Sequence, residues 1–214
     1  MNKVFNLPAI LPLHGIDRET AGLNELKTEL IRKSIHFLIA LSPSMAAVNR
    51  SLTVVILMAG TVFYTAMEGL RLSGIQVPLI SPLTHMASRS RDRGRFVLGP
   101  VTLGIGALLA LMLYPSPAAF IAVYAMAFGD GFASLIGKFF GRTRPAFLLG
   151  KSLEGSAACF MVVFFAAYRV SSSGLVAMVS AVTATLVEAL PLEDYDNIAL
   201  PVTVGLAAHL AALG

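Results

Sequence analysis

The sequence predicts an all-α protein, a bundle of about seven helices that crosses a membrane as a polytopic integral membrane protein. Hydrophobic residues make up 56% of the 214-residue chain and charged residues only 13%, and the mean hydropathy is +0.77. A water-soluble domain needs more charge on its surface than this. The apolar residues also form separate runs near the length of a membrane-crossing helix, with the charges gathered between the runs.

Seven apolar segments follow one another along the chain. We expect residues 1–28 to form a peripheral segment at the membrane surface and residues 29–214 to form one transmembrane domain. Pro43 is expected to kink the first segment, and the longest polar linker covers residues 72–95. The seven segments span roughly residues 32–49, 51–71, 96–114, 117–139, 155–170, 173–191 and 198–213.

The distribution of positive charge predicts the orientation. If the N-terminus is cytoplasmic, 14 of the 16 lysines and arginines lie on the cytoplasmic side, and only Arg50 and Arg169 lie outside. Cytoplasmic loops carry such an excess of positive charge. An odd number of segments then places the C-terminus outside and the active face in the cytoplasm. The net charge of +4 therefore reflects topology, and we expect no nucleic-acid partner.

The strongest chemical signal lies in residues 130–156. Asp130 falls within an apolar segment, where a carboxylate is costly and marks a functional candidate. Small residues follow it on one helical face, so that a ligand or another backbone can come close. An acid, a small-residue face and nearby cations suit a metal-bound polyphosphate; the alternative is a packing face beside lipid headgroups. The small residues are Ala133, Gly137 and Gly141, and the second polar cluster consists of Lys151, Ser152, Glu154 and Gly155.

The spacing of these residues resembles the CTP-binding signature of the dolichol and phytol kinase family. The family usually has two lysines before its Thr or Ser, whereas the first of these positions is Gly150 here. The resemblance implies that residues 29–214 form a lipid kinase domain, which uses Mg²⁺ and transfers a phosphoryl group from CTP. The acceptor would be a membrane-embedded alcohol: phytol, farnesol, a polyprenol, dolichol or diacylglycerol.

The hypothesis assigns three kinds of role to individual residues. Asp130, Lys151 and Glu154 are the predicted catalytic residues, with Asp130 as a base or a metal ligand and Lys151 neutralising phosphate charge. The predicted metal ligands are Asp130, Glu154, Glu188 and Asp196. The residues predicted to bind the nucleotide are Arg32, Lys33, His36, Arg95, Ala133, Gly137, Gly141, Lys151, Ser152, Gly155 and Asn197.

Two clusters near the first two segments have two interpretations each. Glu29, Arg32, Lys33 and His36 share a helical face. They form either an interfacial cluster that reaches lipid headgroups or, as an Arg-Lys-x2-His arrangement in these lipid kinases implies, part of the site. Glu68 and Arg71, three residues apart, form either a local ion pair or, by the same resemblance, part of the site's framework.

Two further polar stretches also leave alternatives open. The arginines at 89, 91, 93 and 95 would meet anionic lipid or clamp phosphates, and the resemblance favours the end at Arg95, Gly99 and Pro100. The acidic residues 188–197 form a solvated turn or supply oxygen ligands for Mg²⁺. An Asp-Asn pair such as Asp196-Asn197 recurs near the end of phytol kinases, which favours a role in the site.

Two rival functions remain. Phosphatidate cytidylyltransferases, which make CDP-lipids, have a similar glycine and lysine stretch, but they end in His-Gly-Gly-x3-Asp-Arg where this chain has Asp-Tyr-Asp-Asn at 194–197. A transporter needs polar groups near the membrane midplane, whereas the charges here gather on one face. A Walker A loop is excluded because its first glycine would fall at Pro145.

Overall fold

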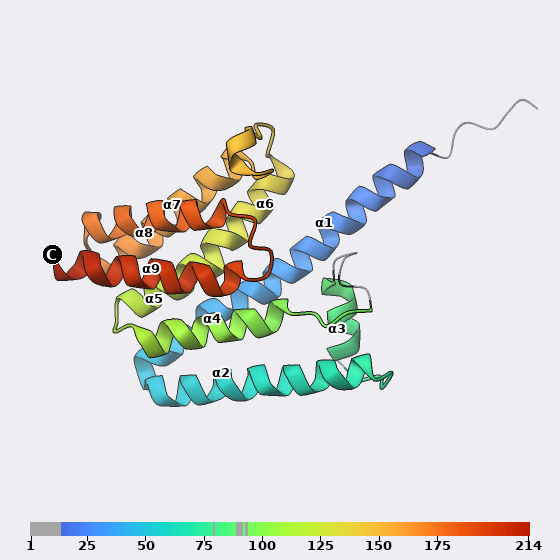
Figure 1. Cartoon of the computed structure of the whole chain (residues 1–214), viewed down its shortest axis with the longest axis horizontal. Helices are drawn as coiled ribbons and strands as arrows, with labels where there is room; N and C mark the ends of the chain where they lie inside the picture. Colours follow the sequence, from blue (N-terminus) through green and yellow to red (C-terminus); the bar gives the residue numbers. More distant parts are fainter. Residues whose placement is uncertain (1–13, 79, 89–91, 93) are drawn as a thin grey trace, which may run out of the picture.

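The computed structural model describes residues 14–78, 80–88, 92 and 94–214, and the side chains of residues 14–25, His85 and Phe147 lie outside that description. The all-α prediction is confirmed: the described residues form helices and turns and contain no β-strand (Figure 1). The helices are α1 (His14–Leu38), α2 (Ser42–Leu72), α3 (Ile80–Ala87), α4 (Gly99–Leu113), α5 (Ala118–Tyr124), a π-helix (Ala125–Asp130), α6 (Gly131–Phe139), α7 (Leu153–Ser171), α8 (Gly174–Glu188) and α9 (Asp196–Leu213), with short 3-10 turns at Ile39–Leu41 and Ala146–Leu148.

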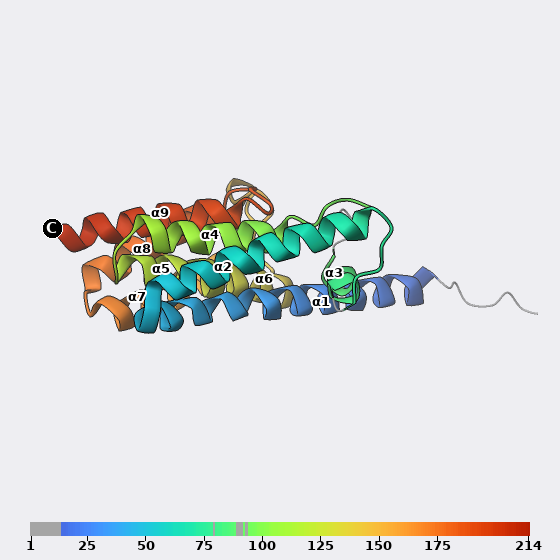
Figure 2. The ribbon, with the colours of Figure 1, turned by 90° about the horizontal axis from the view of Figure 1, so that it is seen from below.

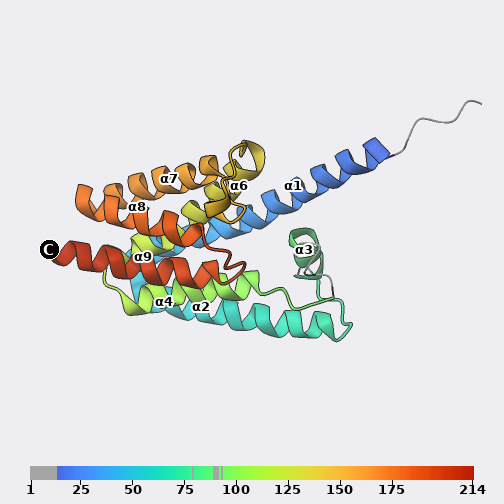
Figure 3. The same ribbon diagram turned by 45° about the horizontal axis from the view of Figure 1, so that its top comes forward.

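The centre of the bundle is the stretch from α5 through the π-helix to α6. In residues 118–139, 61% of the most apolar 18-residue stretch is buried inside the bundle. In residues 26–72, the corresponding share is 11%. Around this stretch, α4 lies between α2 and α9, and α8 lies between α7 and α9 (Figures 1 and 3). Many of the buried core residues are alanines, which let helices approach closely.

The apolar exterior fits a lipid environment. In the part of the chain that the structure describes, four stretches are long and apolar enough to cross a membrane: Leu26–Leu72, Ala118–Phe139, Leu153–Ser171 and Asp196–Leu213. At 15 residues each, α4 and α8 are about 22 Å long, shorter than the roughly 30 Å of hydrocarbon in a bilayer. Large apolar side chains along α2 are exposed, an arrangement that water disfavours and lipid does not: Leu52, Val55, Ile56, Val62 and Phe63.

The polar connections gather at one end of the bundle. The described residues of 73–78, 80–88, 94–98, 140–152 and 189–195 lie at the end on the right of Figure 1, and the C-terminus lies at the opposite end. Viewed from below, α1 extends past the remaining helices at that polar end (Figure 2). The bundle therefore has the two-ended character that the charge distribution predicts, while its orientation in a membrane stays a prediction.

The first two apolar segments are separated at Asn49, as the predicted boundary between 49 and 51 requires. Asn49 leaves the helical conformation (φ −152°, ψ 99°), and its Oδ1 accepts a hydrogen bond from the backbone N–H of Leu52 at 3.0 Å. Asn49 is thus a side-chain N-cap for the rest of α2. Pro43 lies elsewhere, in the first turn of α2, where its missing N–H is harmless. The predicted interruption of the first segment lies directly before it, at the 3-10 turn Ile39–Leu41.

Two segments predicted to lie outside the main helices, residues 1–28 and the linker 72–95, contain more helix than the sequence suggested. The backbone of α1 continues through residue 28 without a break, and the polar linker 72–95 contains the short helix α3. The prediction of a peripheral segment for residues 1–13, and that of a basic run at Arg89, Arg91 and Arg93, lie outside the described residues.

Candidate active site at the polar end of the bundle

Asp130 is the centre of a buried polar cluster. It ends the π-helix and is 4% exposed. Its Oδ2 atom accepts a hydrogen bond from the Lys33 ammonium and lies 3.4 Å from His36 Nε2, while its Oδ1 accepts one from Ser134 Oγ at 3.3 Å. A π-helix is rare and often marks a functional site. The buried carboxylate is therefore compensated by a buried cation, as a charge in such a position must be.

The polar face of α1 packs inward on this cluster. Glu29, Lys33 and His36 are all buried. His36 Nε2 donates to the carbonyl oxygen of Met126 at 2.9 Å, which fixes the imidazole against the π-helix. Glu29 accepts from Arg32 at 2.7 Å and from Lys138 at 3.0 Å. This face of α1 is therefore part of the protein interior and does not extend toward headgroups.

The glycine face of α6 packs against the start of α7. A Cβ on Gly155 would lie 2.7 Å from the carbonyl oxygen of Ala133, and one on Gly137 would lie 3.0 Å from Ser152 Oγ. A Cβ on Gly141 would lie 2.6 Å from the same oxygen. Ser152 is the N-cap of α7, since its Oγ accepts from Gly155 N at 3.1 Å. The small residues therefore bring the cap of α7 into contact with α6.

The connection between α6 and α7 is held by its own charged residues. Glu154 accepts hydrogen bonds from the backbone N–H groups of Arg142 and Thr143, both at 3.1 Å. Arg144 donates to the carbonyl oxygens of Gly150 at 2.6 Å and Gly137 at 3.0 Å. Gly150 has φ +94°, a conformation that suits glycine, so a lysine would be strained at this position.

These elements enclose a pocket of about 200 Å³, which we call the polar pocket. Lys151 Nζ donates to Glu188 Oε1 at 2.6 Å. Burial lowers the pKa of the Lys151 ammonium, but the neighbouring Glu188 carboxylate outweighs this and leaves that pKa raised. Two buried oxygens in the lining, Glu188 Oε2 and Ser156 Oγ, have no hydrogen-bond partner among the described residues. The lining comprises Glu29, Ala133, Ser134, Gly137, Lys138, Arg144, Lys151, Ser152, Gly155, Ser156 and Glu188.

The acidic segment contributes to this region through its two ends. Glu188 ends α8, where a carboxylate opposes the helix dipole and is held instead by Lys151. Asp196 begins α9, is half-buried, and interacts electrostatically with Asp130, Lys33 and Lys151. Asn197 is buried elsewhere, with its amide nitrogen donating to Thr102 Oγ1 at 3.0 Å. The two acids thus lie near the cations, and Asn197 does not line the polar pocket.

Magnesium fits this set of donors as part of a nucleotide complex. No group of three or more His, Cys, Asp and Glu residues forms a ready-made metal site in the part of the chain that the structure describes. Mg²⁺ is commonly held by one or two carboxylates together with substrate phosphates and water, so three protein ligands are not required. The unpaired Glu188 Oε2 is an acceptor of the right kind.

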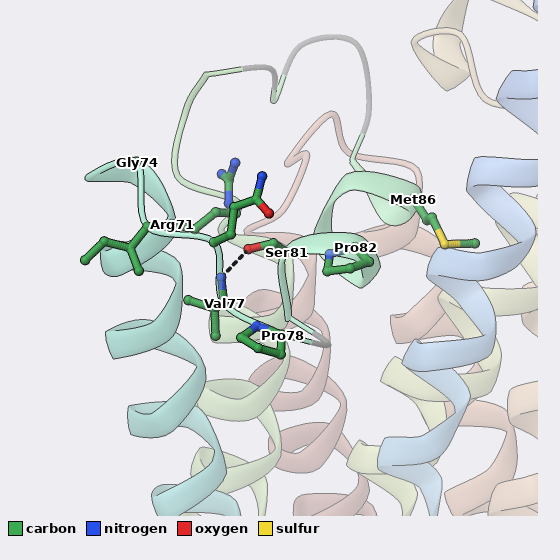
Figure 4. A pocket seen from close by; sticks show the side chains of 9 residues that line it. Arg71, Gly74, Val77, Pro78, Ser81, Pro82 and Met86 are labelled. Carbon is green, nitrogen blue, oxygen red and sulfur yellow. Dashed lines mark hydrogen bonds between the residues drawn. The ribbon is translucent and has the colours of Figure 1, made fainter.

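Glu68 and Arg71 form a structural pair with a further contact. Arg71 binds both carboxylate oxygens of the buried Glu68 at 2.7 Å, and Glu68 also accepts from the backbone N–H of Val97 at 2.9 Å. The pair therefore joins the end of α2 to the segment before α4. Beside it lies a pocket of about 710 Å³ lined by Arg71 and residues up to Met86, where Val77 N donates to Ser81 Oγ at 2.9 Å (Figure 4). This pocket shares no residue with the polar pocket.

Sequence comparison identifies relatives of the chain. It is 33% identical over 170 residues to phytol kinase 1 of Arabidopsis thaliana. The aligned region covers 70% of this chain and 56% of that protein. The chain is a homologue of plant phytol and farnesol kinases. It is also 30% identical over 147 residues to a probable phytol kinase of Triticum aestivum (60% of this chain, 49% of the relative) and 29% identical over 140 residues to farnesol kinase of Arabidopsis thaliana (58% and 46%).

The chain spans about half the length of the curated relatives it matches. All three relatives are named as chloroplastic proteins. No protein-family model and no solved structure matches the chain.

In this phytol kinase homologue the predicted site residues fall into distinct groups. Lys33 and His36 approach Asp130 from α1, whereas Arg32 pairs with Glu29 and lies 3.9 Å from Asp194. Asp196 interacts with this group electrostatically. Arg95 is exposed and lines neither pocket described above. Those that line the polar pocket are Ala133, Gly137, Lys151, Ser152, Gly155 and Glu188. The three with structural contacts elsewhere are Gly141, Glu154 and Asn197.

Two serines of the site escaped the sequence prediction. Ser134 lies four residues after Asp130 and Ser156 four residues after Ser152, so each sits one helical turn further along the same face. That spacing is a signal that could have found them. Serine is common on membrane helices, however, and only the fold shows which hydroxyls face a polar pocket.

Proposed function

We propose that this protein is a kinase for a membrane-embedded prenol, with CTP as the phosphoryl donor and Mg²⁺ as the metal. One observation carries the proposal: residues 130–156 enclose a polar pocket rich in cations, directly beside the buried Asp130–Lys33 pair. The similarity to phytol and farnesol kinases supports a prenol as the acceptor. The choice of CTP rests on the resemblance of residues 130–155 to the CTP-binding signature.

The polar pocket offers the groups that a polyphosphate requires. Lys138, Arg144 and Lys151 line it together with Glu29 and Glu188, which pair with Lys138 and Lys151. The lining thus carries a net charge of +1, and Mg²⁺ would have to balance much of the charge of a nucleoside triphosphate. The N-terminus of α7, with Ser152 and Gly155, also lines the pocket and favours negative charge there. A phosphate near Lys151 would compete with Glu188 for the ammonium.

Glu188 and Asp196 are the residues that would hold the magnesium ion. The ion would supply neutralisation of the charge that develops on the transferred phosphate. Asp196 does not line the polar pocket, but its carboxylate at the start of α9 is attracted electrostatically by Lys33 and Lys151, which supports it as a candidate ligand beside these cations. Glu154 is a weaker candidate for a ligand than the sequence suggested, because its carboxylate holds the backbone of Arg142 and Thr143.

The reaction transfers the terminal phosphoryl group to the alcohol. A new bond forms between the alcohol oxygen and the γ-phosphorus while the bond from that phosphorus to the β,γ-bridging oxygen breaks, so CDP leaves. Asp130, held by Lys33 and Ser134, would accept the hydroxyl proton. Phosphoryl transfer depends mainly on alignment and charge neutralisation, so a modest base suffices.

The proposal is tested with purified protein in lipid nanodiscs, Mg²⁺ and CTP labelled at the γ-phosphate. Farnesol, phytol, a long polyprenol and diacylglycerol are supplied in turn, with the double variant Asp130→Asn and Lys33→Met, which leaves no unpaired buried charge, as the matched inactive control. We expect a labelled prenyl monophosphate and stoichiometric CDP. Release of pyrophosphate with formation of a CDP-lipid would favour a cytidylyltransferase instead, and activity with ATP but not CTP would remove the assignment of the donor.

We also propose that the protein spans the membrane several times with its polar end in the cytoplasm. The exposed apolar surface and the gathering of polar connections at one end support this placement. Reporter fusions at Gly214 and within residues 72–95 should report opposite sides of the membrane. Reporters on the same side would contradict an odd number of crossings.

A further inference from the structure

A second pocket, of about 300 Å³, lies among α1, α2, α3, α4 and α9, and we call it the apolar pocket. Most of its wall is hydrocarbon and aromatic ring, from Ile35, Leu38, Tyr64, Leu83, Val97 and Leu103. Polar groups contribute to one part of the lining, among them Arg32, His36 and Asn197. A largely apolar cavity with a few polar groups is the usual form of a small-molecule site, and this volume is at the lower end of the usual range.

The exposure of the lining shows which side is open. Leu38 and Leu83 are 64% and 44% exposed, whereas Val97, Leu103, His36 and Asn197 are buried. The entrance is therefore formed by leucines of α1 and α3 and faces the apolar surroundings of the bundle. Of the polar side chains in the lining, His36 and Asn197 are buried, whereas Arg32, Asp92 and Asp194 are only partly buried. An occupant with one polar end would therefore place that end against His36 and Asn197.

The inner part of the apolar pocket reaches the same carboxylate as the polar pocket. His36 lines the apolar pocket and lies 3.4 Å from Asp130 Oδ2. Ser134 lines the polar pocket and donates to Asp130 Oδ1 at 3.3 Å. The two pockets share no lining residue. Asp130 itself lines neither pocket but lies between them, with its Oδ1 hydrogen-bonded to Ser134 and its Oδ2 close to His36.

We propose that the apolar pocket binds the hydroxyl end and first isoprene units of the acceptor prenol. This inference rests on the proposed function, because it needs a phosphate donor in the polar pocket. The tail leaves through the leucine-lined entrance into the membrane. The pocket is too small for a whole long-chain prenol, so chain length beyond its entrance has little effect on affinity.

Two inner side chains are suited to hold the hydroxyl. The amide nitrogen of Asn197 is oriented by Thr102 Oγ1 at 3.0 Å and Gly99 O at 3.4 Å. This orientation leaves the side-chain oxygen of Asn197 available to accept a hydrogen bond from the prenol hydroxyl. The His36 imidazole, fixed by Met126 O and facing Asp130, lies on the path from the hydroxyl to that carboxylate.

The wall opposite α1 is rigid for a physical reason. The buried Glu68 accepts hydrogen bonds from Arg71 and from Val97 N, and Tyr64 Oη donates to Val97 O at 3.4 Å. These contacts fix the segment before α4 against α2. Gly99 and Pro100 at the start of α4 line the pocket directly. A preformed wall reduces the cost of ordering when a flexible chain binds.

The experiment uses a farnesol analogue with a diazirine near its hydroxyl end, incorporated with the full-length protein in nanodiscs and mapped by mass spectrometry after irradiation. We expect adducts on inner lining residues of α1, α4 or α9, removed by excess farnesol and not by CTP. Leu83→Trp, at the exposed entrance, should fold normally and raise the KM for farnesol by about tenfold. It should leave thermal protection by CTP unchanged.

Leu52→Trp is the matched control, because Leu52 is similarly exposed on α2 and lies outside the pocket. It should leave labelling and KM unchanged. Adducts competed by CTP rather than farnesol would identify a nucleoside site and overturn the inference, as would labelling spread over the exposed face of α2. If labelling maps to the pocket but no alcohol is phosphorylated, the proposed function fails and the binding site stands. If phosphorylation occurs while labelling maps elsewhere, the binding site fails alone.

Discussion

The polar and apolar pockets differ in how the chain builds them. Most of the polar pocket comes from one stretch, residues 133–156, completed by Glu29 and Glu188. The apolar pocket takes its lining from five helices, and its residues are spread from Arg32 to Asn197. A phosphate site is marked by charged and small residues at short spacing, whereas an apolar site consists of ordinary membrane-helix residues. The difference explains why a sequence signature reveals the donor side of such an enzyme and not the acceptor side.

Asp130→Asn should have the largest effect, because Asp130 serves both pockets. Loss of a base reduces turnover by about 100-fold or more, and an unpaired Lys33 in the interior destabilises the fold by about 3–5 kcal/mol. Turnover and thermal unfolding are measured together in nanodiscs. The double variant Asp130→Asn with Lys33→Met should recover stability and remain inactive. Recovery of activity in the double variant would show that Asp130 is only a structural partner.

Lys151→Met tests the polar pocket alone. We expect the KM for CTP to rise about tenfold, since one charge-assisted phosphate contact is lost, while the KM for farnesol stays unchanged. The matched control is Lys27→Met, on α1 and outside both pockets. Steady-state kinetics with each substrate varied in turn decides. A parallel rise in the KM for farnesol would mean that the two pockets are not independent.

Asp196→Ala distinguishes metal binding from phosphate binding in and beside the polar pocket. If Asp196 helps to hold Mg²⁺, the concentration of Mg²⁺ for half-maximal activity should rise about tenfold. Lys151→Met should leave that concentration nearly unchanged. Titration of Mg²⁺ against both variants, at saturating prenol, gives the answer. An unaltered curve for Asp196→Ala would return residues 189–196 to a solvated turn.

Gly155→Ala tests the close contact between α6 and α7 that shapes the polar pocket. The added Cβ would meet the carbonyl oxygen of Ala133 at 2.7 Å, and overpacking of this kind costs about 1–3 kcal/mol. Gly69→Ala on α2 is the control, because nothing lies within 4 Å of its Cβ. That change should be neutral or stabilise the helix by up to about 1 kcal/mol. Equal melting temperatures for the two variants would contradict the packing described here.

Glu154→Gln should have the smallest effect of the five. Its carboxylate holds two backbone N–H groups of the connection between α6 and α7, and a neutral amide oxygen can still accept one of them. We expect a decrease in turnover of about threefold or less, with no change in the Mg²⁺ requirement. A sharply raised Mg²⁺ requirement would restore Glu154 as a metal ligand.

The sequence predicts the parts of this protein that depend on local pattern. The all-α class follows from composition. The candidacy of Asp130 follows from the cost of charge in an apolar segment, and that of Lys151 from the polar cluster that follows at a short spacing. The pairing of Lys33 with Asp130, 97 residues apart, could not be predicted from helical periodicity, which shows only that Lys33 shares a face with Glu29 and His36.

The role of Glu154 was obscured for a similar reason. A carboxylate close to Lys151 in sequence suggests a metal ligand, but the N-terminal turn of α7 directs it to the preceding connection. Arg95 shows that a charge pattern can also point to a residue outside the site. Its place in the arginine run suggested phosphate binding, but its exposed side chain lines neither the polar nor the apolar pocket.

The π-helix at Ala125–Asp130 gives the polar cluster a dependence on chain length. A π-turn contains one residue more than an α-turn, and each residue advances an α-helix by about 100°. Deleting one residue between Ala125 and Phe128 would restore a regular α-helix and leave the hydropathy of the segment almost unaltered. Because the six residues of the π-helix turn through nearly the same angle as five residues of an α-helix, the flanking helices would stay in register, but Met126 and Asp130 would change position relative to each other. Either the hydrogen bond from His36 to the carbonyl oxygen of Met126 or the pair between Lys33 and Asp130 would then be lost. A deletion that leaves the hydropathy of the segment almost unchanged would therefore disrupt the centre of the site.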